Sequence, residues 1–359
     1  MRIAFHAPMK PPDHPVPSGD RLMARLLMQA MRLAGHTVFL ASRFRGFAKT
    51  PEDFQARQAE GEAEAARIAA EWQAGPMPDL FFCYHTYFKA PDYLGPPLAE
   101  TFGIPYVTAE ASYTLSRDAG SWAGAQAVVR RGLQQAALNL CFTGRDREGL
   151  LSVVGAERLA MLPPFIDTSL FTSSAVGSIP PRLVTVAMMR VGDKLDSYRL
   201  LASALVSCTD LPWRLAIVGD GPCRDEVREM FSAIDPARLE WLGEKQPEEV
   251  PAILAASDIY VWPGFGEAFG LAYLEAQAAG LPVVAMATAG VPEVVRDGET
   301  GLLTPHGDVA ALAAAIRTLL HDAVRRQSLG AAARRFVLGE RSLEKAAATL
   351  KILLARFEP

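Results

Sequence analysis

Residues Trp262–Ala276 read WPGFGEAFGLAYLEA and show an order of elements that identifies the fold class. A short apolar run ends at Trp262, a glycine-rich turn follows, and a helical pattern begins near Gly270. Strand, turn and helix in this order form the repeating unit of a parallel sheet. We therefore expect Glu267 in the loop at the carboxyl end of a strand and Glu275 within the following helix.

The same alternation extends along the whole chain. Apolar runs that are followed by helical patterns predict strands at Arg2–Phe5, Thr37–Ala41, Leu80–Tyr84, Pro105–Ala109 and Leu138–Phe142 in the first half, and at Leu183–Ala187, Leu215–Val218, Glu240–Leu242, Ile259–Trp262 and Val283–Met286 in the second. This pattern predicts an α/β protein with two Rossmann-like, doubly wound domains. Ligands of such sheets bind in the loops after the strands, so these loops are the place to look for chemistry.

The length of 359 residues also predicts two domains, at about 100–200 residues each. Residues 165–181 are rich in Pro, Ser and Gly and show little periodicity, which is typical of an interdomain connection. We therefore place the domains at residues 1–165 and 166–342. Residues 343–359 read as an amphipathic helix beyond the second sheet, which leaves it able to pack back on the first domain.

Composition excludes several classes of protein. The 36 Lys+Arg against 40 Asp+Glu give a net charge of −4, which provides no global attraction to nucleic acid. The four cysteines form no C-x-x-C pair, so reduced thiols are expected and a zinc site is not. The N-terminus lacks the apolar region of a signal peptide, and the most apolar stretch, Ala278–Val291, is broken by Gly and Pro. These features predict a cytoplasmic protein.

One feature leaves a peripheral contact with the inner face of a membrane open. Arg21, Arg25 and Arg32 recur at near-helical spacing and form a basic stripe on the first predicted helix, which starts about Arg21. Such a stripe suits weak binding to anionic lipid or to an anionic acceptor. It equally suits a solvated helix face.

Two cations follow the strand Leu183–Ala187. Arg190 and Lys194 stand four positions apart in a strand-to-helix loop and could close on one polyanionic group, Arg as a fork and Lys as a point charge. The alternative is a surface loop in which Asp193 and Asp196 pair with these cations.

Backbone groups offer a second way to hold an anion. Free N–H groups around Phe269, Gly270 and Leu271, at the expected helix start, could bind a diphosphate. Gly219, after the strand Leu215–Val218, permits a tight turn and a close approach of backbone to ligand. The chain contains neither a complete G-x-G-x-x-G pattern after a strand nor a G-x-x-x-x-G-K-[ST] loop, which argues against NAD binding and P-loop chemistry.

In the first half, Gly19 and the helix that follows it make another element able to face an anion. His85, Glu110 and Arg145 each follow a predicted strand and are expected on the ligand side, although a structural role suits each of them as well. His6, Asp13 and His14 could together bind a metal, but their spacing matches no standard motif. We therefore predict no metal site.

These residues carry a resemblance to a known family. Glu267 and Glu275 form an E-x7-E motif, and its surroundings, Pro263–Asp308, resemble the donor-binding segment of retaining GT-B glycosyltransferases of family 4. The likeness extends to LAIVGDGP at 215–222, to PPFIDTSLF at 163–171 and, more loosely, to RLAGHTVFLA at 32–41. It is dense in the second domain and sparse in the first.

The resemblance implies a GT-B fold in which two Rossmann-like domains face a central cleft, with acceptor on the first domain and nucleotide-sugar donor on the second. It implies that Glu267 grips hydroxyls of the donor sugar and that Glu275 accepts hydrogen bonds from the ribose. Arg190 and Lys194 would neutralise the diphosphate, Gly19 would lie near it, and His85 would lie beside the anomeric centre. It implies no cofactor and no metal.

The expected reaction is transfer of a sugar from a nucleoside-diphosphate sugar to an acceptor hydroxyl, with retention of configuration. The acceptor stays open between a glycan, a lipid-linked sugar and a small molecule, and the loop Gly243–Lys245 is one candidate for contacts with the base. Three alternatives keep the fold and change the function: a nucleotide-sugar epimerase, a phosphorylase, and a non-catalytic nucleotide-sugar-binding module.

Overall fold

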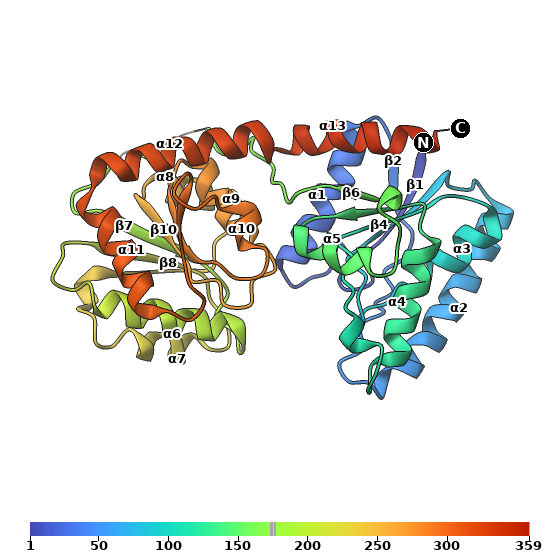
Figure 1. The fold of residues 1–359 in the computed structure, drawn as a ribbon, viewed down its shortest axis with the longest axis horizontal. Coiled ribbons are helices and arrows are strands. Elements are labelled where there is room, and N and C mark those ends of the chain that lie inside the picture. Colours follow the sequence, from blue (N-terminus) through green and yellow to red (C-terminus); the bar gives the residue numbers. More distant parts are fainter. Residues whose placement is uncertain (173–174, 176, 359) are drawn as a thin grey trace. The chain divides into compact units, whose positions relative to one another are not determined.

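The computed structural model describes residues 1–172, 175 and 177–358. They form two compact units, which we call unit 1 (Met1–Pro164 with Leu343–Pro359) and unit 2 (Phe165–Ser342). Each unit contains one parallel sheet with helices around it (Figure 1). The expected interdomain connection at 165–181 includes Ser173, Ser174 and Val176, which lie outside the described residues.

Unit 1 contains a six-stranded parallel sheet in the order β2-β1-β3-β4-β5-β6. Its strands are β1 (Arg2–His6), β2 (Thr37–Leu40), β3 (Leu80–Tyr84), β4 (Tyr106–Ala109), β5 (Leu138–Cys141) and β6 (Leu159–Met161). Its helices are α1 (Gly19–Leu33), α2 (Asp53–Ala74), α3 (Gly95–Phe102), α4 (Ala123–Gln135), α5 (Gly144–Leu151) and α13 (Leu343–Leu354), with 3-10 turns η1 (Leu115–Arg117), η2 (Ala156–Arg158) and η4 (Ala355–Phe357).

Unit 2 repeats the scheme with the strand order β12-β11-β10-β7-β8-β9. Its strands are β7 (Arg182–Val186), β8 (Arg214–Val218), β9 (Leu239–Gly243), β10 (Ile259–Val261), β11 (Val283–Met286) and β12 (Gly301–Thr304). Its helices are α6 (Asp193–Val206), α7 (Arg224–Met230), α8 (Val250–Ala255), α9 (Leu271–Ala278), α10 (Val291–Val294), α11 (Val309–His321) and α12 (Ala323–Glu340), with the 3-10 turn η3 (Pro236–Arg238).

The ten expected strands are all present, within about a residue at each end. Two more were missed, β6 (Leu159–Met161) and β12 (Gly301–Thr304). Both are short edge strands, bonded to a neighbour on one side only. A short run that packs on one side leaves too little periodicity to separate a strand from a loop.

The first helix begins earlier than expected. The Ser18 side chain accepts a hydrogen bond from the backbone N–H of Arg21 at 3.2 Å, so α1 starts at Gly19 instead of about Arg21. A serine cap satisfies one of the orphan N–H groups of the first turn. Gly19, which the sequence places near an anion, is therefore the first residue of this helix.

The C-terminal helix α13 belongs to unit 1, although unit 2 precedes it in the chain. It lies against α1 (Figure 1) and buries an apolar face there. The buried residues are Leu343, Ala346, Ala347, Leu350 and Leu354. Unit 1 is thus completed by the last segment of the chain.

Two further observations concern composition. All four cysteines are buried and free. Within the described part of the chain, no helix combines the length and the apolarity that crossing a bilayer requires.

Candidate functional site

The strongest constellation in unit 2 surrounds Glu267. Its Oε1 accepts a hydrogen bond from the Trp262 indole N–H at 3.2 Å, and the same oxygen pairs with the Lys194 ammonium. The side chains of Lys194 and Glu267 are 19% and 18% exposed, so the pair is shielded but still open to a ligand. The sequence predicted separate tasks for these two residues, and the structure brings them together.

The lysine reaches this position from the first turn of α6. Its Nζ lies 5.6 Å from the ring centroid of Trp262, and the Trp262 ring itself packs edge-on against Tyr198 at 4.9 Å between centroids. Trp262 is only 2% exposed, so the ion pair lies against a buried side chain that is held in place by its neighbours. Sequence reasoning treated Trp262 as a strand end and missed its role as a donor to Glu267.

The loop that carries Glu267 is fixed to the same helix. The backbone N–H of Phe265 donates to the Ser197 hydroxyl at 2.9 Å, and this hydroxyl donates to the Asp193 carbonyl at 2.8 Å. Ser197 is fully buried. These bonds explain how α6 and the loop before α9 hold one arrangement.

Glycines make the loop possible. Gly264, Gly266 and Gly270 have φ values of 74°, 67° and 78°, in the left-handed region that disfavours side chains. A Cβ at Gly264 or Gly270 would overlap Tyr273, and one at Gly266 would overlap the Asp193 carboxylate. The glycine-rich turn is therefore required by local geometry, whether or not a ligand binds.

Helix α9 begins directly after this turn. Gly270 is its N-cap residue and has no side chain to cap the helix, while Leu271 is the first helical residue. The N–H groups of a first turn have no partner within the helix, so this end is suited to hold an anion. Phe269 is buried, and its side chain packs into the unit.

Glu275 lies further along α9. Burial raises the pKa of its carboxyl to about 7, and among the described residues no donor forms a hydrogen bond to this carboxylate. Burial, together with the charges of Glu267 and Glu275, raises the pKa of Tyr260 well above its usual value. Both acids of the E-x7-E motif therefore act on the same buried tyrosine.

The remaining predicted residues of unit 2 lie in neighbouring loops. Arg190 is exposed in the loop between β7 and α6. Gly219, with φ 137°, lies against the backbone of Ala187, whose carbonyl oxygen a Cβ would overlap. The close approach that the sequence predicted at Gly219 is thus made to the neighbouring loop of the protein itself.

In unit 1, His85 follows β3 and is held from α1. Its Nδ1 lies 3.0 Å from Oδ1 of Asp20, the residue next to Gly19. Burial acts to lower the pKa of His85, but the charges of Glu110 and Asp20 outweigh it and raise the pKa to about 9. For Asp20, burial acts to raise the pKa, and the bond to His85 outweighs it, so that pKa is lowered. The pair favours an imidazolium and a carboxylate.

Glu110 follows β4 and is only 7% exposed. Burial raises the pKa of its carboxyl to about 7, although His85 and Tyr84 act in the opposite direction. His85 and Glu110 both have positive φ, 59° and 53°, a conformation that costs about 1–3 kcal/mol for a residue with a side chain. Arg145, the third residue singled out after a strand, is exposed on α5.

The three candidate metal ligands of the N-terminal segment do not meet. His6 bonds to Asp92, Asp13 pairs with Arg43 at 2.6 Å, and His14 accepts the backbone N–H of Val16 at 3.1 Å. Proximity in sequence was a poor guide, because β1 buries His6 while the other two lie in the loop that follows.

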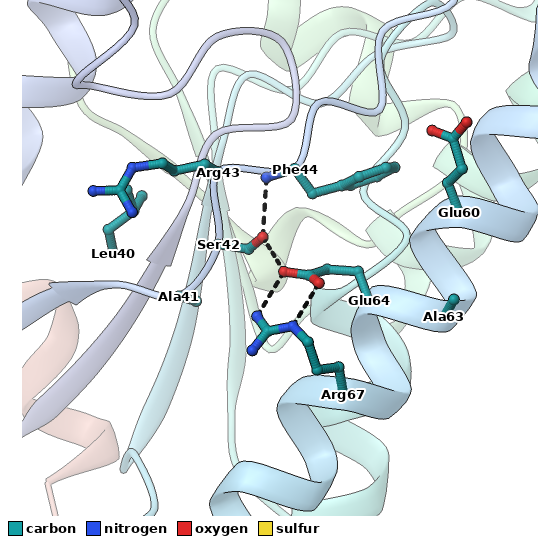
Figure 2. A pocket seen from close by; sticks show the side chains of 9 residues that line it. All are labelled: Leu40, Ala41, Ser42, Arg43, Phe44, Glu60, Ala63, Glu64 and Arg67. Atoms are coloured by element: carbon teal, nitrogen blue, oxygen red, sulfur yellow. Dashed lines mark hydrogen bonds and ion pairs between the residues drawn. The ribbon is translucent and has the colours of Figure 1, made fainter.

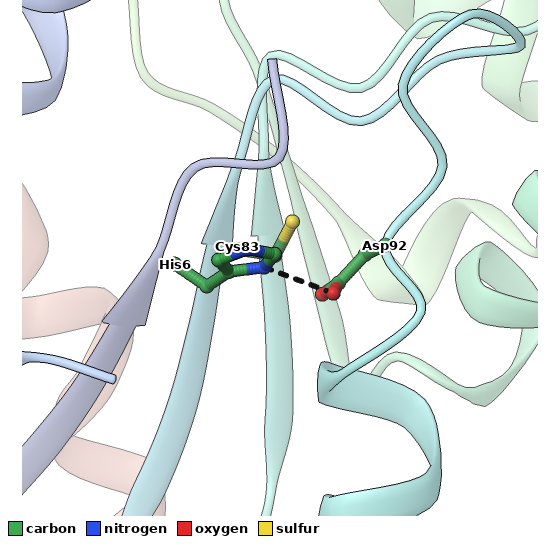
Figure 3. Close-up of side chains that lie close together, drawn as sticks. All are labelled: His6, Cys83 and Asp92. Atoms are coloured by element: carbon green, nitrogen blue, oxygen red, sulfur yellow. Dashed lines mark hydrogen bonds and ion pairs between the residues drawn. The ribbon is translucent and has the colours of Figure 1, made fainter. Parts of the chain in front are cut away.

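His6 belongs to a different group, with Cys83 and Asp92, whose polar atoms lie within 4.8 Å of one another (Figure 3). The His6 ring contacts Asp92 Oδ1 and the Phe44 carbonyl, both at 3.1 Å. Oδ1 of Asp92 also accepts the N–H groups of Leu94 and Gly95, and Oδ2 accepts the Tyr106 hydroxyl. Because protein donors occupy this carboxylate, the group reads as a buried structural network.

Unit 1 also has an open cavity of about 700 Å³ between the carboxyl end of β2 and helix α2 (Figure 2). Ser42 and Arg67 bond to Glu64 inside it. The other charged lining residues, Arg43 and Glu60, are paired with Asp13 and Arg57. Apolar side chains line much of the cavity, and each of its charged side chains is paired with another side chain.

The basic stripe on α1 contacts the protein's own backbone. Arg21 donates to the carbonyls of His14 and Pro15, Arg25 to that of Pro12, and Arg32 to that of Val38. These bonds hold the loop after β1 and the strand β2. They give the stripe a structural task that the sequence did not reveal.

The chain is similar to known proteins in both sequence and fold. Residues 180–322 match the family model described as Glycosyl transferases group 1. The sulfoquinovosyl transferase SQD2 of Arabidopsis thaliana is 34% identical over 158 residues, which cover 43% of this chain and 30% of that protein.

A second relative is the GDP-mannose-dependent alpha-(1-6)-phosphatidylinositol monomannoside mannosyltransferase of Mycolicibacterium smegmatis. It is 33% identical over 197 residues, 50% of this chain and 52% of that protein. The chain thus spans about half the length of this relative, and less of SQD2.

Solved structures match over nearly the whole chain. Sucrose-phosphate synthase from Thermosynechococcus elongatus has a TM-score of 0.79 at 20% identity, covering 99% of this chain and 98% of that one. Anabaena HepE, in complex with UDP, has a TM-score of 0.75 at 17% identity, covering 99% and 100%. The chain therefore has the two-domain α/β GT-B fold, and residues 180–322 are similar to the glycosyl transferases group 1 family.

Proposed function

We propose that this protein is a retaining glycosyltransferase that transfers a sugar from a nucleoside-diphosphate sugar to an acceptor hydroxyl, without a metal ion. The observation that carries the proposal is the Glu267 carboxylate, held between the Lys194 ammonium and the Trp262 indole N–H next to an uncapped helix start. The names of the relatives support the class, and HepE, a neighbour in fold, was solved with UDP and with UDP-glucose.

The reaction creates charges for which unit 2 has matching groups. When the bond between the anomeric carbon and the phosphate oxygen breaks, its electron pair goes to the diphosphate. In our proposal Arg190, Lys194 and the first N–H groups of α9 stabilise this negative charge. Lys194 has three N–H donors, so it can contact a phosphate oxygen while it keeps Glu267 in place.

Glu267 would accept hydrogen bonds from hydroxyls of the donor sugar, and Glu275 from the ribose. The acceptor hydroxyl, bound by unit 1, would attack on the face that the diphosphate leaves. Its proton would pass to the departing phosphate oxygen, so the products are the glycoside and a protonated nucleoside diphosphate. No step requires a protein nucleophile, which separates this scheme from two-carboxylate glycoside hydrolysis.

The test measures thermal stabilisation and slow hydrolysis with UDP-, GDP-, ADP-, TDP- and CMP-sugars, with EDTA or with divalent metal. We expect one donor class to stabilise the protein and to be hydrolysed equally well in EDTA. Glu267→Gln should lower turnover by about 10²-fold or more and retain stabilisation by the donor. Glu229→Gln, an exposed acid on α7 in the same unit, is the control and should behave as wild type.

Three outcomes would contradict the proposal. Stabilisation without turnover in the wild type would indicate a binding module, and conversion of the donor to another nucleotide sugar would indicate an epimerase. Loss of activity in EDTA would overturn metal independence. Once an acceptor is found, the anomeric configuration of the product, read by NMR, decides between retention and inversion.

A further inference from the structure

The carboxyl ends of β3 and β4 carry two residues in a strained backbone conformation. The ladder between these strands ends at the pair Tyr84 and Ala109, and His85 and Glu110 are the first residues after the two strands. The backbone N–H of His85 still donates to the Ala109 carbonyl at 2.9 Å, so the two positions remain neighbours. Both adopt left-handed φ values. Strain of this kind persists where the surroundings enforce it, and it concentrates at functional sites.

Glu110 also holds an unsatisfied polar atom. Its Oε2 is buried and has no hydrogen-bond partner. Burying an oxygen that accepts no hydrogen bond lowers the stability of the folded protein, and an apolar side chain at this position would avoid that loss. Hydrogen bonding therefore does not explain why an acid occupies position 110.

The neighbouring charges supply that explanation. Charged or titratable groups on the neighbouring elements act on His85 and Glu110: Asp20 on α1, Tyr84 on β3 and Asp146 on α5. Two cations act in turn on these acids, Lys10 on Asp20 and Arg145 on Asp146. Three acids thus surround one histidine. The carboxylate of Asp20 contacts Nδ1 of His85, while Nε2 has no hydrogen-bond partner among the described residues. The side chain of His85 is 20% exposed.

We propose that Glu110 is a positioning residue that keeps His85 in the doubly protonated imidazolium form, with Nδ1–H directed at Asp20 and Nε2–H left to donate to the substrate. The assignment rests on the proposed transferase function and on the position beside the anomeric centre that the resemblance to family 4 implies for His85. An imidazolium donates hydrogen bonds and accepts none, so Nε2 would select an oxygen lone pair of the bound substrate. Glu110 acts through His85 and does not itself contact the substrate.

The first test reads the proton on His85 and needs no turnover. Side-chain nitrogen chemical shifts of the intact protein would be followed by NMR from pH 5 to 10, with His85 assigned from the missing signal in His85→Gln. In the wild type we expect His85 to titrate near pH 9. Glu110→Gln, which keeps the shape and removes the charge, should lower this midpoint by at least about one pH unit, a tenfold loss of proton affinity.

Matched variants separate charge from shape. Glu110→Asp keeps the charge one methylene further back and should give an intermediate midpoint, and this variant carries the test if Glu110→Gln does not fold. Glu100→Gln, an exposed acid on α3 of the same unit, should leave the midpoint unchanged. An unchanged His85 midpoint in Glu110→Gln would overturn the proposal.

The second test is the pH profile of kcat/KM for the donor. The imidazolium is lost as pH rises through its pKa, so a lower pKa should move the alkaline limb of the profile to lower pH in Glu110→Gln, by the same interval as the NMR midpoint. A shifted midpoint with an unshifted profile would overturn the role in the reaction. If no donor is turned over at all, the proposed function fails, while the NMR titration still decides whether Glu110 sets the charge of His85.

Discussion

At the scale of single residues, the partly buried acid Glu275 makes the stability of the protein depend on pH. Its folded pKa of about 7 lies above the ordinary value of 4.5, so the folded state binds more protons than the unfolded state between these two values. Stability should therefore fall as pH rises from about 4.5 to 7 and level off above. Glu275→Gln removes this dependence and should stabilise the protein by about 1–3 kcal/mol at pH 8, with a much smaller gain at pH 5.

Urea unfolding at the two pH values checks this expectation, with Glu229→Gln as an exposed control. The same gain in the free energy of unfolding at pH 5 and pH 8 would show that the carboxyl of Glu275 ionises as an ordinary acid does.

A second residue-scale prediction concerns glycine. Gly219 and Gly298 both have positive φ, 137° and 71°, but a Cβ at Gly219 would overlap the Ala187 carbonyl oxygen whereas a Cβ at Gly298 would meet open space. Gly298→Ala should cost about 1–2 kcal/mol, the backbone term alone. Gly219→Ala should cost at least about 3 kcal/mol, because the loop after β7 must also move. Equal losses of stability in urea unfolding would contradict the steric argument.

At the scale of elements, helix α13 is held by one face only. Leu350 is fully buried in its contact with α1, while Ile352, two residues on, is 76% exposed. Leu350→Ala should destabilise unit 1 by about 2–5 kcal/mol, because it leaves a cavity. Ile352→Ala should change stability by no more than about 0.5 kcal/mol. Hydrogen exchange of β1 and α1 reads the effect within unit 1, and similar protection in both variants would argue against this packing.

At the scale of the whole molecule, unit 1 is discontinuous in sequence and unit 2 is not. All six strands of the second sheet lie within Phe165–Ser342, so this fragment should unfold cooperatively by itself. Residues 1–164 alone should lack a cooperative thermal transition and should regain it when 343–359 are attached through a flexible linker, because α13 covers apolar side chains of α1. Cooperative unfolding of 1–164 alone would show that α13 is dispensable.

The sequence predicted the parallel α/β architecture because strand and helix differ in their hydrophobic period, which is a local property. For the same reason it predicted that Glu267 lies in a loop, that a helix begins after Gly270, and that Arg190 lies between β7 and α6. Lys194, expected in the same loop, lies instead in the first turn of α6. The edge strands β6 and β12 were not predicted, because a short strand bonded on one side has little hydrophobic periodicity.

Contacts between segments that are distant in sequence depend on the tertiary structure and could not be predicted from local patterns. Lys194 meets Glu267 across 73 positions, and His85 meets Asp20 across 65. The tertiary structure also decided that His6 pairs with Asp92 instead of its sequence neighbours, and that burial raises the pKa of Glu110 and Glu275 to about 7. Periodicity fixes which residues follow a strand, but partners and solvation depend on how the strands are ordered and packed, and this information is spread over the whole chain.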